Sequence, residues 1–195
     1  MEKEKILGFD VCVNSENELI SELFKDYNNN IQNVIINVNP EIVINNYEDK
    51  KLVSDFNSQK FQIPDGIGIV YASKINKGKI KKRIAGIDFM KRLCEESIKY
   101  NSRVFLYGTQ QDVLEKAKIE IENNYKGINI VGICNGFTDE DVVVERIKET
   151  KPDILFVGTG SPKQEKFILN NKDRLSTVKI LMPVGRKLWC DKQYF

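Results

Sequence analysis

Residues 103–134, with the sequence RVFLYGTQQDVLEKAKIEIENNYKGINIVGIC, decide the fold class of this chain. Two short apolar runs, 103–107 and 128–134, enclose the amphipathic stretch 110–124. This pattern predicts a strand, a helix and a second strand. Two strands joined through a helix pair in parallel, whereas antiparallel neighbours need only a short turn. The segment therefore predicts a parallel sheet.

The same alternation continues on both sides of this unit. Toward the carboxyl end, the pattern predicts a helix over 139–150, a strand over 154–157, a helix from Pro162 and a strand over 179–184. Toward the amino end, it predicts strands over 6–13 and 34–38 and helices over 19–27, 41–47, 51–57, 67–75 and 89–100. We expect residues 1–185 to form one α/β domain, a Rossmann-like parallel sheet with helices on both faces.

In such a sheet, ligands bind beyond the carboxyl ends of the strands. The residues at those ends are therefore candidates for binding a substrate: Asn37, Asn39, Gly108, Thr109, Asn135, Gly158, Gly160 and Ser161. The turn over 158–165, GTGSPKQE, places small residues before a helix, where backbone amides favour an anion. It lacks the P-loop pattern. Residues 108–111, GTQQ, lack the later glycines of a dinucleotide fingerprint, so we expect a mononucleotide rather than NAD.

Composition excludes several classes of protein. The chain has 195 residues, 41% of them hydrophobic and 30% charged, and a net charge of +2, which is too small to indicate nucleic-acid binding. No apolar run approaches the roughly 20 residues of a membrane span. The charged start, MEKEK, leads us to expect no signal peptide and a cytoplasmic location.

The chemistry open to the chain is narrowed by its lack of histidine. The four cysteines lie far apart, so zinc sites and Cys-His or Ser-His-Asp catalysis are excluded, and we expect neither a metal nor a cofactor. Cys12 and Cys134 lie in apolar runs and should be core thiols. A general base must then be a carboxylate or, less favourably, Lys or Tyr.

Three polar features have two interpretations each. Asp65, between Pro64 and Gly66, and Asp88 are suited either to cap a helix or to act in a cleft. Residues 74–83, KINKGKIKKR, carry six basic side chains in ten positions, which suit a solvated loop or a surface facing phosphates or anionic lipid. Arg83, at the end of this run, suits a phosphate contact or an exposed charge.

Five segments together resemble the WecG/TagA/CpsF family of bacterial glycosyltransferases. They are 37–41 (NVNPE), 64–68 (PDGIG), 83–88 (RIAGID), 105–108 (FLYG) and 158–165 (GTGSPKQE). The resemblance spans most of residues 5–180 and is most distinctive in PDGIG together with GSPKQE.

The resemblance implies a metal-independent, inverting transferase with a Rossmann-like core. The implied donor is UDP-N-acetylmannosamine, and the implied acceptor is undecaprenyl-diphosphate-linked N-acetylglucosamine, met at the inner face of the cell membrane. The family pattern makes Asp65 the general base. It makes Asn39 and Gln164 sugar or nucleotide contacts and Arg83 a diphosphate contact, and Asp88 lies in a matched segment.

The chain departs from the family pattern at two places. Asn37 stands where the family usually has Thr. Residues 186–195, RKLWCDKQYF, match nothing in the family and replace an expected basic appendage, so we expect a truncated chain that binds nucleotide but transfers poorly.

Other functions remain open at this point. One is a transferase of the same family that uses another UDP-hexose, and another is a nucleotide-binding module without catalysis. An oxidoreductase ranks third. The apolar stretch 67–75 suits either the core or the contact of a homodimer.

Overall fold

The computed structural model describes residues 1–185 and has the expected α/β architecture. The strands are β1 (Lys3–Ile6), β2 (Phe9–Cys12), β3 (Asn33–Val38), β4 (Phe61–Pro64), β5 (Arg103–Gly108), β6 (Asn129–Cys134), β7 (Ile154–Gly158) and β8 (Ile180–Pro183). The helices are α1 (Glu16–Asn28), α2 (Pro40–Asn46), α3 (Lys50–Asn57), α4 (Ile67–Ile75), α5 (Gly86–Lys99), α6 (Gln111–Asn124), α7 (Glu140–Thr150) and α8 (Lys163–Asn171).

A six-stranded parallel sheet forms the centre, in the order β4-β3-β8-β7-β5-β6. The inner strands β3, β7 and β8 are buried along their whole length. This is why they appear in the sequence as continuous apolar runs rather than as alternating patterns. The Rossmann-like sheet predicted from the sequence is confirmed.

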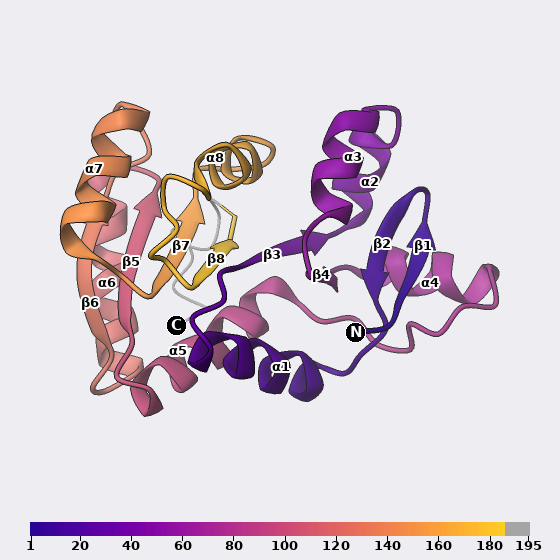
Figure 1. Ribbon diagram of the computed structural model, residues 1–195, viewed down its shortest axis with the longest axis horizontal. Helices are drawn as coiled ribbons and strands as arrows, with labels where there is room; N and C mark the ends of the chain where they lie inside the picture. Colours follow the sequence, from indigo (N-terminus) through magenta and orange to yellow (C-terminus); the bar gives the residue numbers. More distant parts are fainter. Residues whose placement is uncertain (186–195) are drawn as a thin grey trace.

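Helices cover both faces of this sheet (Figure 1). Helices α1, α5 and α6 pack their apolar sides on one face. Helices α2, α3, α7 and α8 pack on the other, together with β2. Because all six strands run in the same direction, their carboxyl ends lie along one edge of the sheet, which we call the carboxyl edge.

Two sequence predictions near the amino terminus were wrong. The strand expected over residues 6–13 is a hairpin, in which β1 and β2 pair antiparallel. Its turn passes through Leu7 and Gly8, whose φ angles are 46° and 91°, and the apolar residues on either side concealed this turn. Strand β4 was not predicted, because its four residues include the polar Gln62 and end in a proline.

The starts of α1 and α2 follow the sequence prediction. Ser15 and Glu18 form the capping box of α1, in which each side chain accepts a hydrogen bond from the other residue's backbone amide. Asn39 Oδ1 accepts from Ile42 N at 2.8 Å, and Pro40 is the first residue of α2. Asn39 therefore ends β3 and starts the next helix at the carboxyl edge.

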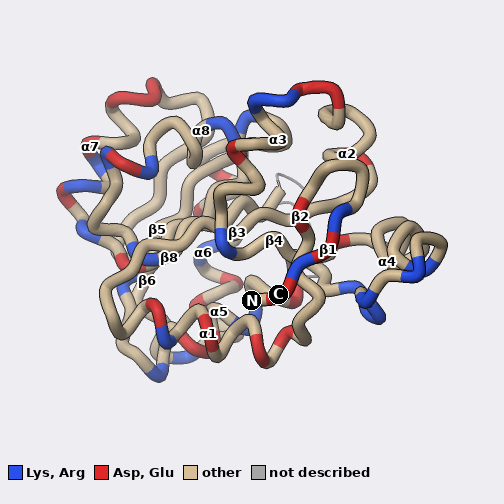
Figure 2. Tube along the Cα trace, turned by 45° about the vertical axis from the view of Figure 1, so that its right-hand side comes forward, with Lys and Arg blue, Asp and Glu red and all other residues tan. Residues whose placement is uncertain are grey.

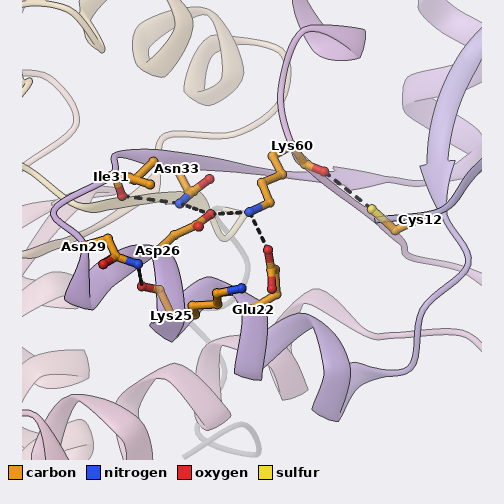
Figure 3. A network of polar contacts seen from close by, with 8 residues as sticks. All are labelled: Cys12, Glu22, Lys25, Asp26, Asn29, Ile31, Asn33 and Lys60. Carbon is orange, nitrogen blue, oxygen red and sulfur yellow. Dashed lines mark hydrogen bonds and ion pairs between the residues drawn. The ribbon is translucent and has the colours of Figure 1, made fainter.

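At the opposite edge, the amino ends of β3 and β4 are joined to α1 by a polar network (Figure 3). Lys60 Nζ lies 2.6 Å from Asp26 Oδ2 and 2.8 Å from Glu22 Oε1. Asn33 Nδ2 donates to the same Asp26 oxygen at 3.1 Å. We call these four residues the Lys60 network, and it fixes the start of β4 against α1.

Within residues 1–185, no helix has the length and apolar character needed to cross a lipid bilayer. The tail that we expected to be atypical, residues 186–195, lies outside the described part of the chain.

Candidate functional site

A pocket of about 340 Å³ opens at the carboxyl edge, above β3, β4 and β8. Six of the residues singled out from the sequence line it: Asn37, Asn39, Asp65, Gly160, Ser161 and Gln164. Glu41, Ile42, Glu165, Val184 and Gly185 complete the lining. The structure thus brings together four segments, 37–42, 65, 160–165 and 184–185, two from each half of the chain.

Asp65 lies directly after β4, at the floor of the turn that leads into α4. Its backbone amide donates to Val38 O at 2.8 Å, which fixes the turn to the end of β3. The N-cap of α4 is Gly66, whose φ of 106° suits glycine, and no side chain caps the helix. The alternative interpretation of Asp65 as a helix cap therefore does not hold. Its Oδ1 instead accepts from Arg83 Nε at 3.3 Å, and Arg83 is half exposed.

Asn37 points from β3 toward the start of α5. Its Nδ2 donates to Pro183 O at 2.9 Å, while its Oδ1 is buried without a partner among the described residues. A Cβ built on Gly86, the first residue of α5, would lie 2.6 Å from Asn37 Nδ2 and 3.3 Å from Asp65 Oδ2. Gly86 is needed because both side chains occupy the space that a methyl group would fill.

The turn over 158–165 is held by Gln164. Its Oε1 accepts from Gly160 N at 3.2 Å and from Gly185 N at 3.1 Å, and its Nε2 donates to Glu165 Oε1 at 2.8 Å. Gln164 is buried, and Gly160 has a φ of 93°. The amide of Gln164 thus ties the turn after β7 to the chain after β8, and it shapes the pocket wall.

Glu165 is the residue of this site that sequence reasoning missed. It is 2% exposed, and its Oε2 is buried without a hydrogen-bond partner among the described residues. Burial raises the pKa of this carboxyl above its ordinary value. The motif GTGSPKQE contained the signal, because Glu165 directly follows Gln164 in the first turn of α8.

Four other predicted residues lie along the same edge but do not line this pocket. Gly108 and Gly158 are the last residues of β5 and β7, and Thr109 and Asn135 directly follow β5 and β6. A Cβ on Gly108 would lie 2.3 Å from Gly158 O, so these two strands approach too closely for any side chain. Gly136 N donates to Thr109 O at 2.8 Å. Close packing between the strand ends accounts for these small residues.

Helix starts surround the pocket. Helices α4, α5 and α8 begin next to Asp65, Asn37 and Gly160, and none of the three has a side-chain cap. Helices α1, α2, α3 and α7 are capped by side chains, whereas α6, which does not line the pocket, is also uncapped. Uncapped amides and the positive helix end favour a bound anion. Asp88 lies in the first turn of α5 and does not line the pocket.

The sequence profile of the glycosyl transferase WecG/TagA/CpsF family matches residues 4–188. This chain belongs to that family. The match covers the whole sheet and each segment that lines the pocket. The family assignment and the pocket thus rest on the same residues.

Three relatives within the family share the name N-acetylglucosaminyldiphosphoundecaprenol N-acetyl-beta-D-mannosaminyltransferase. The protein of Bacillus subtilis (strain 168) is 36% identical over 172 residues, which are 87% of this chain and 67% of that protein. The protein of Bacillus spizizenii is 33% identical, over 69% of this chain and 52% of its own length. The protein of Staphylococcus aureus (strain NCTC 8325) is 30% identical, over 95% and 74%. The chain thus spans between half and three quarters of the length of these relatives.

Proposed function

We propose that this chain transfers N-acetylmannosamine from UDP-N-acetylmannosamine to undecaprenyl-diphosphate-linked N-acetylglucosamine, as part of wall teichoic acid linkage-unit synthesis. The names of its relatives support the proposed identity of the acceptor and of the transferred sugar. The observation that carries the proposal is the pairing of Asp65 with Arg83 beside three uncapped helix starts. A proton acceptor and a set of anion-binding groups then lie at one pocket.

Asp65 is the proposed general base. Its carboxylate takes the proton of an acceptor hydroxyl while that oxygen attacks the anomeric carbon of the donor sugar. The bond between the anomeric carbon and the UDP oxygen breaks, and UDP leaves with the bonding electron pair. Attack from the face opposite the leaving group inverts the anomeric carbon. Because the Arg83 side chain is half exposed, it can turn from Asp65 toward a diphosphate. Its guanidinium can then pair with the phosphate oxygens in a bidentate manner.

The leaving diphosphate needs positive partners in the transition state. We assign this role to Arg83 and to the first amides of α5 and α8, without a metal ion. Asn37, Asn39, Ser161 and Gln164 are proposed contacts of the sugar or nucleotide, in which Gln164 acts by holding the turn at Gly160. Asp88, Gly108, Thr109, Asn135 and Gly158 complete the proposed substrate-binding edge.

The lipid-linked acceptor implies work at the cytoplasmic face of the cell membrane, with the protein held there peripherally. Residues 1–185 form the proposed catalytic core. Two alternatives use the same pocket: a transferase for another UDP-hexose, and a nucleotide-binding module without turnover.

The test measures UDP release by this chain with each of several UDP-hexoses, in the presence and absence of lipid-linked acceptor. The proposal expects release that requires the acceptor, is fastest with UDP-N-acetylmannosamine and persists in EDTA. Acceptor-dependent release with a different UDP-hexose would assign the alternative donor. Binding of UDP without release on any acceptor would assign the non-catalytic module. A strict requirement for Mg²⁺ or Mn²⁺ would overturn the proposed mechanism.

A further inference from the structure

Helix α4 carries an apolar stripe on its outer side. Ile67, Tyr71 and Ile75 are 57%, 59% and 81% exposed. They are spaced four residues apart, so they lie on one side of the helix. Ile69 and Ser73, on the opposite side, are buried. Single exposed apolar residues are common on protein surfaces, but three large ones aligned on one helix form a patch that water solvates poorly.

A basic segment, residues 74–83, continues from the end of this stripe. Its lysines and Arg83 are exposed. Lys74, Lys77, Lys81 and Lys82 make no ion pair with any residue in 1–185. Figure 2 shows these basic residues gathered at α4 and on the loop beside it, at the end of the molecule. The positive charge therefore lies next to the apolar stripe and is not neutralised there.

The basic segment has a fixed position. Gly78 N donates to Ser73 O at 2.7 Å, and Ile80 N donates to Ser73 Oγ at 3.1 Å, so the loop folds back on its own helix. The Glu4 carboxylate of the β1 hairpin accepts from Lys79 N, and Glu2 pairs with the Lys79 ammonium. The lysines are thus held beside the stripe by backbone contacts, and the ammonium groups of Lys74, Lys77, Lys81 and Lys82 have no ion-pair partner within residues 1–185.

We propose that the α4 stripe and the basic segment dock together on an anionic lipid bilayer. Ile67, Tyr71 and Ile75 enter the boundary between headgroups and acyl chains, where isoleucine and tyrosine are both well accommodated. The lysines extend along this boundary to lipid phosphates. A second copy of this chain fits the same surface poorly, because a two-fold contact places each basic segment opposite its equal.

The α4 stripe and the basic segment both have one end next to Asp65, the candidate base. Helix α4 starts two residues after Asp65, and the basic segment ends at Arg83, which pairs with Asp65. Docking by this surface therefore holds the pocket at the level of lipid headgroups, where a lipid-linked diphosphate is found. This role rests on the proposed function, whereas the docking itself does not.

The test is co-sedimentation of the chain with vesicles of phosphatidylcholine alone or mixed with phosphatidylglycerol, without donor or acceptor. We expect binding to the anionic vesicles only, weakened by salt. Lys77→Glu/Lys81→Glu should lower the affinity roughly tenfold or more. Tyr71→Ser/Ile75→Ser should lower it while leaving the lysines in place. All four positions are exposed, and circular dichroism checks that each variant is folded.

Matched controls lie on α6, away from this surface. Lys116→Glu/Lys118→Glu makes the same change in net charge, and Ile119→Ser removes an isoleucine that is 55% exposed. These variants should bind vesicles like the parent. Equal binding to both vesicle types, or equal losses in the α6 controls, would overturn the proposal. So would a dimer in sedimentation equilibrium that Ile75→Ser dissociates. Vesicle binding without turnover would count against the proposed function alone.

Discussion

The polar side chains at the two ends of β3 and β4 differ in whether they have hydrogen-bond partners. At the amino ends, Lys60, Asp26, Glu22 and Asn33 satisfy one another at distances of 2.6–3.1 Å (Figure 3). At the carboxyl ends, Asn37 Oδ1 and, across the pocket, Glu165 Oε2 are buried without a hydrogen-bond partner in residues 1–185. Buried polar groups are normally paired, because an unpaired one costs about 1–3 kcal/mol.

The difference separates what stabilises the chain from what acts on a ligand. The side chains of the Lys60 network are paired with one another. The carboxyl edge keeps free oxygens and uncapped helix amides at a cost in stability, and functional sites commonly tolerate such costs. Changes at the amino edge should therefore lower the free energy of unfolding, and changes at the carboxyl edge should lower activity.

The largest effect is expected for Asp65→Asn. The variant keeps the shape of the turn and removes the proton acceptor, so acceptor-dependent UDP release should fall by ~10²–10⁴-fold. The melting temperature and UDP binding should change little, because Asp65 does not cap α4. Near-normal turnover would show that Asp65 is not the general base, and Asp88 would then be the next candidate.

Lys60→Met tests the amino edge. It leaves Asp26, which has a side chain only 8% exposed, without its ammonium partner. The free energy of unfolding, measured by urea denaturation, should fall by about 1.5–3 kcal/mol. Turnover per folded molecule should stay at the parent level.

The double variant Lys60→Met/Asp26→Asn is the matched control. It removes both charges, so it should recover part of the loss. If Lys60→Met instead lowered turnover at unchanged stability, the division between the two edges would be wrong.

A subtler test uses Gly86→Ala. The added methyl group would push on Asn37 Nδ2 and Asp65 Oδ2 without removing any functional group. Since small displacements of catalytic groups are costly, turnover should fall roughly tenfold or more. The melting temperature should change by only a few degrees. The control is Gly127→Ala, where a Cβ would meet only Ile98 Cγ2 at 3.7 Å. Its φ of 94° should lower stability but not turnover per folded molecule.

The smallest effect is expected for Glu165→Gln. Burial raises the pKa of Glu165, so the folded chain holds this proton to higher pH than the unfolded chain does. Stability contributed by the protonated carboxyl is therefore lost as the pH rises through the folded-state pKa. The variant should be more stable than the parent by about 1 kcal/mol near neutral pH.

This gain should shrink as the pH falls toward the ordinary pKa of glutamate. Thermal unfolding of both proteins across this pH range measures the difference. A gain that is constant with pH would exclude titration of Glu165 as its cause.

Most of the sheet could be predicted from the sequence, because the apolar pattern of each strand and helix is visible within its own residues. Strands β5 and β7 are buried over nearly their whole length, β6 is mostly half-buried, and the apolar period of the intervening helices separates the three strands clearly. The β1–β2 hairpin and β4 could not be predicted in this way. Each of their strands has only four residues, and their pairing depends on contacts with distant segments.

The residues of the pocket were predicted in part, and for a different reason. Asn37 and Asn39 could be placed at strand ends by pattern, but Asp65 was assigned as base only through the family resemblance. Pattern alone left Asp65 between cap and catalyst. Because Gly66 is the N-cap of α4 and no side chain caps this helix, the structure excludes the cap, and the role of Asp65 as base is a proposal. The unpaired oxygen of Glu165 could be identified only from the structure, because the spacing of residues in the sequence does not show whether a side chain at the start of a helix is buried.

The β1–β2 hairpin also has a consequence for how the chain is made. It leaves the ribosome before the residues that it contacts, because its contacts reach Asn57, Gln59 and Lys79, 47 to 77 residues later. At ordinary synthesis rates this interval lasts roughly 2–15 seconds. An isolated two-stranded hairpin is barely stable in water. Three charged residues in four, Lys3, Glu4 and Lys5, keep β1 from pairing with other nascent chains while it waits.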